Sequence, residues 1–134
     1  MQIQVDAKIN EIIEAAAEKI LKNEGKEITK PWGKEKILEC NDDYVVKEIT
    51  VNKGEELSLQ YHEKKRETIF HLEGYGRVFK AGKYYQLAGR EKVHIEPYEI
   101  HKIEAHPHNE LKVLEVSTPE LDDVVRINDK YGRV

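Results

Sequence analysis

The segment Gly54-Glu-Glu-Leu-Ser-Leu-Gln-Tyr-His-Glu-Lys-Lys-Arg-Glu67 decides the fold of this chain. Successive side chains of a β-strand point to opposite faces of the sheet. A strand over residues 56–62 therefore turns Ser58, Gln60 and His62 toward one face and the leucines and tyrosine between them toward the other. Two side chains with metal-binding atoms, an amide and an imidazole, then point the same way.

A hairpin is expected to follow this strand. The charged residues 63–66 suit an exposed loop, and the alternating residues 68–72 form a second strand that ends at Gly74. Such a loop places His62 and Glu67 roughly opposite each other. The alternative is a polar hairpin with a solvated face and no site.

A fourth ligand is expected from a later segment. His101 follows the turn Glu96-Pro-Tyr-Glu99 and opens a strand whose alternate residues can look into a barrel. Two imidazoles, one carboxylate and one amide oxygen form a mixed nitrogen and oxygen set that suits zinc, manganese, iron, nickel or cobalt. We expect one divalent metal ion, with zinc or manganese favoured, on Gln60, His62, Glu67 and His101.

Length and composition indicate a single domain that needs no disulfide. The chain has 134 residues, a formal net charge of -4 and one cysteine, Cys40. The N-terminus lacks the basic start and apolar run of a secretory signal, so a cytoplasmic location is expected. No segment approaches the roughly 18 consecutive apolar residues of a membrane span. The acidic balance and the lack of a basic stripe argue against nucleic acid as a partner.

Two kinds of periodicity divide the chain. Apolar residues recur at helical spacing across residues 7–24, with Asp6 as N-cap and Gly25 as the stop. This helix either contacts a partner, such as a second copy, or lies on its own domain. From residue 30 onward, about nine short alternating runs separated by turn signals indicate an all-β sandwich or barrel of the jelly-roll kind. We therefore expect a helical extension over residues 1–29 and a β domain over residues 30–134.

Together these motifs resemble the cupin superfamily, a family of jelly-roll proteins. Its first motif has the form G-x5-H-x-H-x4-E-x6-G, and every spacing is kept here, with glutamine in the first histidine position. The motif residues are Gly54, Gln60, His62, Glu67 and Gly74. The second cupin motif is matched loosely, because Pro97 lies four residues before His101, no glycine follows it, and Ala105 stands in the asparagine position.

Glutamine in the first histidine position of the motif, Gln60, indicates a resemblance to one particular group of cupins. The segments Ser58-Leu-Gln-Tyr-His62, Lys30-Pro-Trp-Gly33 and 122–133 are similar to the cupin domain of type II mannose-6-phosphate isomerases. That domain often forms the C-terminal part of a bifunctional isomerase and mannose-1-phosphate guanylyltransferase. The resemblance implies a metal-dependent aldose-ketose isomerase of a sugar phosphate, most similar to mannose-6-phosphate isomerase, that moves a proton through a metal-stabilised enediol. The alternatives are a cupin enzyme for a free sugar or another small molecule, and a non-catalytic sugar-binding module.

The resemblance also suggests roles for individual residues. The catalytic candidates are Glu67, Lys102 and His71, with Glu48 as a further candidate base. Lys102 stands where these isomerases usually have arginine. The candidates for binding the sugar phosphate are Lys47, Arg126 and Arg133, although Arg133 could equally pair with a carboxylate that closes the barrel. Trp32 is expected to pack in the core rather than stack on a sugar, and a homodimer is expected.

Overall fold

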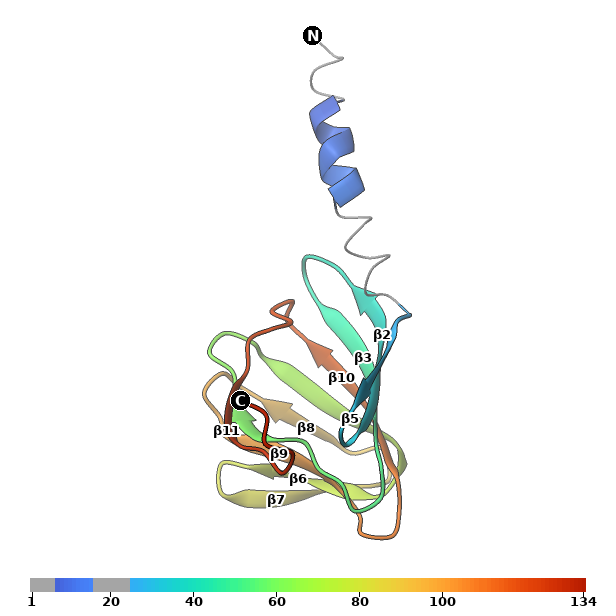
Figure 1. The fold of residues 1–134 in the computed structure, drawn as a ribbon, viewed down its shortest axis with the longest axis vertical. Helices are drawn as coiled ribbons and strands as arrows, with labels where there is room; N and C mark the ends of the chain where they lie inside the picture. Colours follow the sequence, from blue (N-terminus) through green and yellow to red (C-terminus); the bar gives the residue numbers. More distant parts are fainter. Residues whose placement is uncertain (1–6, 16–24) are drawn as a thin grey trace.

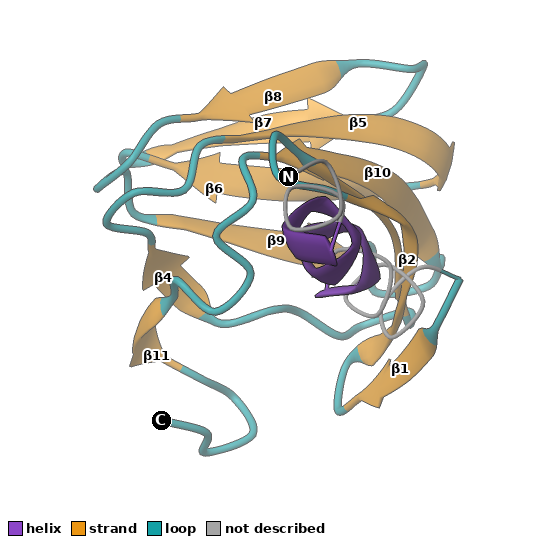
Figure 2. Ribbon diagram, turned by 90° about the horizontal axis from the view of Figure 1, so that it is seen from above, coloured by secondary structure: helices purple, strands orange, loops and turns teal. Residues whose placement is uncertain are grey.

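The computed structural model describes residues 7–15 and 25–134, and the strands in these ranges form two antiparallel sheets packed face to face (Figures 1 and 2). The larger sheet has the order β1-β2-β3-β10-β5-β8 and the smaller one β11-β4-β9-β6-β7. The strands are β1 (Glu27–Lys30), β2 (Gly33–Cys40), β3 (Val45–Val51), β4 (Leu59–Tyr61), β5 (Glu67–Gly74), β6 (Gly76–Lys80), β7 (Lys83–Leu87), β8 (Lys92–Ile95), β9 (His101–Ala105), β10 (Leu111–Ser117) and β11 (Val125–Asn128). The predicted all-β sandwich is confirmed.

Two strands are additional to those predicted, and one is shorter. β1 and β11 are edge strands of four residues each, and neither shows a clean alternation of buried and exposed residues. The predicted strand over residues 56–62 is reduced to β4, preceded by an isolated bridge between Glu56 and Glu104. β1 begins inside the segment assigned to the N-terminal extension, and the division of the chain at residue 30 stays a prediction.

Residues 7–15 are helical, as the periodicity predicts, and their apolar side chains Ile9, Ile12 and Ile13 are exposed. Asp6 and residues 16–24, which complete the predicted helix, lie outside the described residues. In the described ranges no helix is long and apolar enough to cross a membrane. The homodimer and the cytoplasmic location stay predictions.

The interior between the sheets changes character along its length. One end is a hydrophobic core that includes Trp32, Val51, Ile103, Leu111 and Val113. Trp32 is buried within this core, as expected. Further along the same inward-facing rows, β2, β3, β5, β9 and β10 each carry a buried ionisable residue: Glu35, Lys47, Glu67, His101 and Glu115. A polar cavity is therefore built on an apolar base.

Gly74 ends β5 at a point where the backbone leaves no room for a side chain. Its φ is +78°, and an added Cβ would lie 1.8 Å from the carbonyl oxygen of Glu110. Gly89 has a φ of +57°, but a Cβ there would meet nothing within 4 Å. Both glycines thus have a positive φ that disfavours other residues, but only Gly74 lies so close to another backbone segment that a side chain would clash.

We predict that Gly74→Ala lowers the free energy of unfolding by at least about 2 kcal/mol more than Gly89→Ala, which should cost about 1–2 kcal/mol for its backbone conformation alone. Urea denaturation of the two variants and the wild type measures the difference. Equal losses in both variants would show that the close approach to Glu110 has no energetic weight.

Candidate metal centre and adjoining pocket

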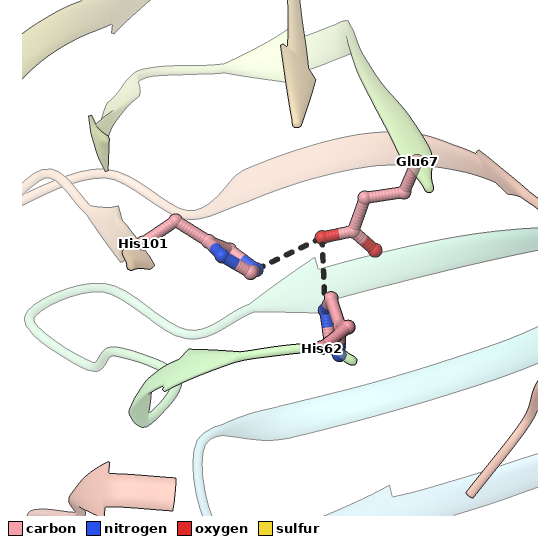
Figure 3. Close-up of side chains that lie close together, drawn as sticks. All are labelled: His62, Glu67 and His101. Carbon is pink, nitrogen blue, oxygen red and sulfur yellow. Dashed lines mark ion pairs between the residues drawn. The ribbon is translucent and has the colours of Figure 1, made fainter. Parts of the chain in front are cut away.

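Three of the predicted ligands meet at the polar end of the interior (Figure 3). His62 follows β4, Glu67 opens β5 and His101 opens β9. The Oε1 atom of Glu67 lies 2.9 Å from Nε2 of His101 and 3.4 Å from Nε2 of His62. All three side chains are at most 2% exposed. The hairpin between β4 and β5 and the turn before β9 therefore bring two imidazoles and a carboxylate together.

The second nitrogen of each ring fixes its orientation. Nδ1 of His62 lies 2.6 Å from the carbonyl oxygen of Asp123, and Nδ1 of His101 lies 2.8 Å from that of Glu99. A carbonyl only accepts, so each Nδ1 donates its proton, and in the neutral ring Nε2 keeps a lone pair. Both Nε2 atoms are buried without a hydrogen-bond partner. Such lone pairs converging beside a carboxylate oxygen fit a divalent metal ion.

Gln60 lies beside this group. It pairs with His101 across β4 and β9 and lines the same pocket as His62. Its Oε1 atom accepts a hydrogen bond of 2.7 Å from the hydroxyl of Ser58. This position agrees with the shared face expected for Gln60 and His62. Its role as a fourth ligand stays a prediction.

Lys65 corrects the expectation of a fully exposed loop. It is 7% exposed, and its Nζ lies 3.4 Å from Oε2 of Glu67 and 3.0 Å from Oε1 of Glu115. The ammonium is therefore held between two buried carboxylates, one of them in the candidate metal group. Lys65 carried no signal in the sequence, because a loop lacks the periodicity that reports on burial.

The neighbouring charges of Glu67, Glu115 and Lys65 shift the pKa of each of these groups. Burial opposes ionisation of Glu67, but the adjacent rings of His101 and His62 and the charge of Lys65 hold the pKa of that carboxyl well below its ordinary value. Burial and the charge of Glu67 raise the pKa of Glu115. Burial also disfavours the charged form of Lys65, yet Glu115 and Glu67 raise its pKa above the ordinary value. Glu67 is thus kept as the carboxylate that a metal ion requires.

A pocket of about 410 Å³ opens beside His62. Its ionisable lining includes the three predicted substrate-binding residues together with Lys65, Glu35 and Glu115. Lys47 pairs with Glu35 at 3.4 Å, and Arg133 holds both oxygens of Asp129 at 2.9 and 3.0 Å. Arg126 donates from Nη1 to the carbonyl oxygen of Val134 at 2.7 Å, while its Nε is buried without a partner. The substrate-binding candidates therefore share one pocket with His62 of the candidate metal group.

The remaining catalytic candidates lie elsewhere. Lys102 points away from His101 because neighbours on a strand alternate, and it pairs with Glu56 and Glu104 at 3.0 and 2.9 Å. This geometry corrects its proposed catalytic role. Glu48 is excluded in the same way, since it lies 3.7 Å from Lys112 on the outer side of the larger sheet.

His71 lies on the same side of β5 as Glu67 but farther along the strand. It lies four residues beyond Glu67 on β5, on the same side of the strand, and does not line the pocket. Its Nε2 donates to the carbonyl oxygen of Gly74 at 2.8 Å, and its Nδ1 accepts from the backbone N–H of Arg90 at 3.1 Å. Both ring nitrogens of His71 therefore have backbone partners, and its catalytic role stays a prediction.

We predict that Lys65→Met lowers the free energy of unfolding of the metal-free protein by about 3–5 kcal/mol, because it leaves two buried carboxylates without their shared cation. Lys64→Met is the matched control, since its neighbouring side chain is exposed and should change stability by less than about 0.5 kcal/mol. Chemical denaturation at neutral pH measures both. Equal stability of the two variants would mean that Lys65 points to solvent.

Comparisons with known proteins identify the family of the chain and agree with its fold. Residues 17–129 match the family model described as mannose-6-phosphate isomerase C-terminal. The chain is 38% identical over 112 residues to the mannose-1-phosphate guanylyltransferase ManC of Salmonella typhimurium, covering 81% of this chain and 23% of that protein. It is 29% identical over 110 residues to the alginate biosynthesis protein AlgA of Pseudomonas aeruginosa, covering 80% and 23%. The chain thus spans about a quarter of the length of these relatives.

Solved structures show the same architecture at low sequence identity. A cupin-2 domain protein from Rhodospirillum rubrum superposes with a TM-score of 0.65 at 18% identity, over 69% of this chain and 64% of that one. The capsular polysaccharide assembling protein CapF of Staphylococcus aureus superposes with a TM-score of 0.69 at 16% identity, over 77% and 34%. These likenesses establish the fold alone. The chain therefore has the cupin fold and belongs to the family described as mannose-6-phosphate isomerase C-terminal.

Proposed function

We propose that this domain is a metal-dependent aldose-ketose isomerase that interconverts mannose 6-phosphate and fructose 6-phosphate. The observation that carries the proposal is the group His62, Glu67 and His101, because its member His62 lines a pocket that is also lined by arginine and lysine side chains. The family model is named for the isomerase, whereas curated relatives such as ManC of Salmonella typhimurium are named guanylyltransferases and are about four times as long. The isomerase reaction is therefore inferred from the site.

The pocket suits a small anionic sugar. A volume of about 410 Å³ lies within the range of small-molecule sites, and an arginine can hold a phosphate with two parallel hydrogen bonds. The described pocket cations Lys47, Lys65 and Arg133 are paired with carboxylates, whereas Lys30 and Arg126 form no ion pair with a described side chain. Arg126 also has a buried Nε atom without a hydrogen-bond partner. We assign Arg126 as the principal phosphate anchor, with Arg133 beside it.

The isomerisation needs a proton to leave C2 of the aldose and return at C1. A divalent ion on His62, Glu67 and His101, with Gln60 as the predicted fourth ligand, would act as a Lewis acid toward the sugar oxygens. The proton must be carried by an acid–base group that lines the pocket. Neither His71 nor Glu48 lines it. We assign it to the pair of Glu115 and Lys65, whose Oε1 and Nζ atoms lie 3.0 Å apart and which both line the pocket.

We predict that the zinc- or manganese-loaded protein forms mannose 6-phosphate from fructose 6-phosphate in D2O and incorporates solvent deuterium at C2. Removal of the metal with EDTA should abolish turnover, and added metal should restore it. His62→Ala should reduce turnover by at least about 100-fold through loss of a ligand. His94→Ala is the matched control, because this exposed histidine does not line the pocket. Proton and phosphorus NMR follow the reaction.

Three results would contradict parts of this proposal. Failure of the metal-loaded protein to convert any member of a panel of aldoses and their phosphates would exclude the isomerase. Stabilisation by a sugar phosphate without turnover would favour a non-catalytic binding module. Turnover of free sugars alone would remove the role of Arg126 as a phosphate anchor.

A further inference from the structure

Asp123 contacts the metal-binding hairpin through both its side chain and its backbone. It lies between β10 and β11, 61 residues along the chain from His62. Its carboxylate accepts three backbone N–H bonds from the hairpin loop, from Glu63 at 3.0 Å, Lys64 at 2.7 Å and Lys65 at 2.8 Å. Its carbonyl oxygen accepts from Nδ1 of His62. One residue thus engages the start of the hairpin and three successive loop positions.

These contacts fall between two candidate ligands. The loop over residues 63–66 joins His62 to Glu67, so its conformation determines how far apart the two ligand atoms lie. The bond to Nδ1 sets the tautomer that leaves Nε2 of His62 facing Glu67. The loop conformation also turns Lys65 inward onto Glu67. Each of these geometric conditions depends on the position of Asp123.

The segment that carries Asp123 is also part of the pocket. Leu121, Asp122, Val124 and Arg126 line the cavity together with Asp123 itself. β11 follows directly and pairs with β4, the strand that leads into His62. The pocket wall and the metal-binding hairpin are therefore joined at one acidic residue rather than only through the sheets.

We propose that Asp123 is a positioning residue of the metal centre, which clamps the hairpin loop so that His62 and Glu67 present their ligand atoms to one ion. This inference rests on the metal centre of the proposed function but not on the reaction assigned to it. The clamp does not touch the ion. It acts by holding the loop and the His62 ring, and its removal should weaken metal binding by about 10–100-fold, the usual effect of losing such a supporting contact.

The test compares Asp123→Ala and Asp123→Asn with the wild type, using Co²⁺ as the probe. Asp42→Ala is the matched control, because this acid lies in the exposed turn between β2 and β3. Visible absorption titration gives the cobalt affinity, and circular dichroism confirms folding. Hydrogen exchange of the amides of residues 63–65 and the ¹⁵N shifts of His62 are measured on the metal-free protein, where no ion can mask the clamp.

We expect Asp123→Ala to bind Co²⁺ about 10–100-fold more weakly, with faster exchange of the three loop amides that lose their carboxylate acceptor. Asp123→Asn keeps one acceptor oxygen and should be intermediate, and it decides the matter if the alanine variant does not fold. Asp42→Ala should match the wild type in every readout.

Wild-type cobalt affinity in a folded Asp123→Ala protein would overturn the proposal, whether or not the amides exchange faster. So would unchanged affinity in Asp123→Asn where the alanine variant fails to fold, or a wild-type protein that binds no Co²⁺. Weakened cobalt binding in a protein that isomerises no sugar would support the clamp while removing the proposed reaction. The two proposals therefore fail on different measurements.

Discussion

The buried carboxylate of Glu67 is the group on which the rest of the site depends. A carboxylate removed from water is stable only when charges and hydrogen-bond donors surround it. Here one oxygen faces the imidazoles of His62 and His101, and the other faces the ammonium of Lys65. β4, β5, β9 and the hairpin loop must all hold their positions for these contacts to exist together.

The charges around Glu67 favour a cation in the same place. The buried acids and lysines at this end of the interior are Glu35, Lys47, Lys65, Glu67 and Glu115. In this group three carboxylates face two ammoniums, so full ionisation leaves one negative charge at the end of the interior where the histidine lone pairs converge. A divalent ion there reverses the sign of the cluster. The cavity then presents positive charge to a ligand, which suits the sugar phosphate proposed above.

The structure also explains why one end of a small barrel can hold so many charges. The opposite end is packed with aliphatic side chains around Val51, Leu111 and Val113, and this hydrophobic core supplies the stability that a polar interior cannot. Gly74 lets β5 close against the backbone of Glu110 at that end. A rigid base and a charged rim on the same strands are a common arrangement in enzymes that must hold a site in a fixed geometry.

The sequence was sufficient for the parts of the site that follow strand periodicity. Alternation predicted that Gln60 and His62 share a face, and the loop length predicted that Glu67 lies opposite His62. The turn before β9 indicated that His101 points inward. Parity alone does not say how far along a strand a side chain lies from the site, and His71, four residues from Glu67 on β5, has backbone partners at both ring nitrogens.

Residues outside strands carried no such signal. Lys65 lies in a loop that reads as exposed, and its burial depends on Asp123, a partner 58 residues away along the chain. Lys102 was linked to the site by its place in the family motif, although alternation on β9 turns it outward. Long-range contacts and loop conformations of this kind become visible only when the chain is folded.

X-ray absorption spectroscopy of the zinc-loaded protein tests the metal centre most directly, because it reports the atoms that surround the ion. One zinc per chain with two imidazoles and oxygen ligands at about 2.0–2.2 Å is the predicted result, and the imidazole signal should be absent when His62 and His101 are both replaced by alanine. A zinc shell without imidazole, or one that keeps its imidazoles in the double variant, would contradict the assignment of the site.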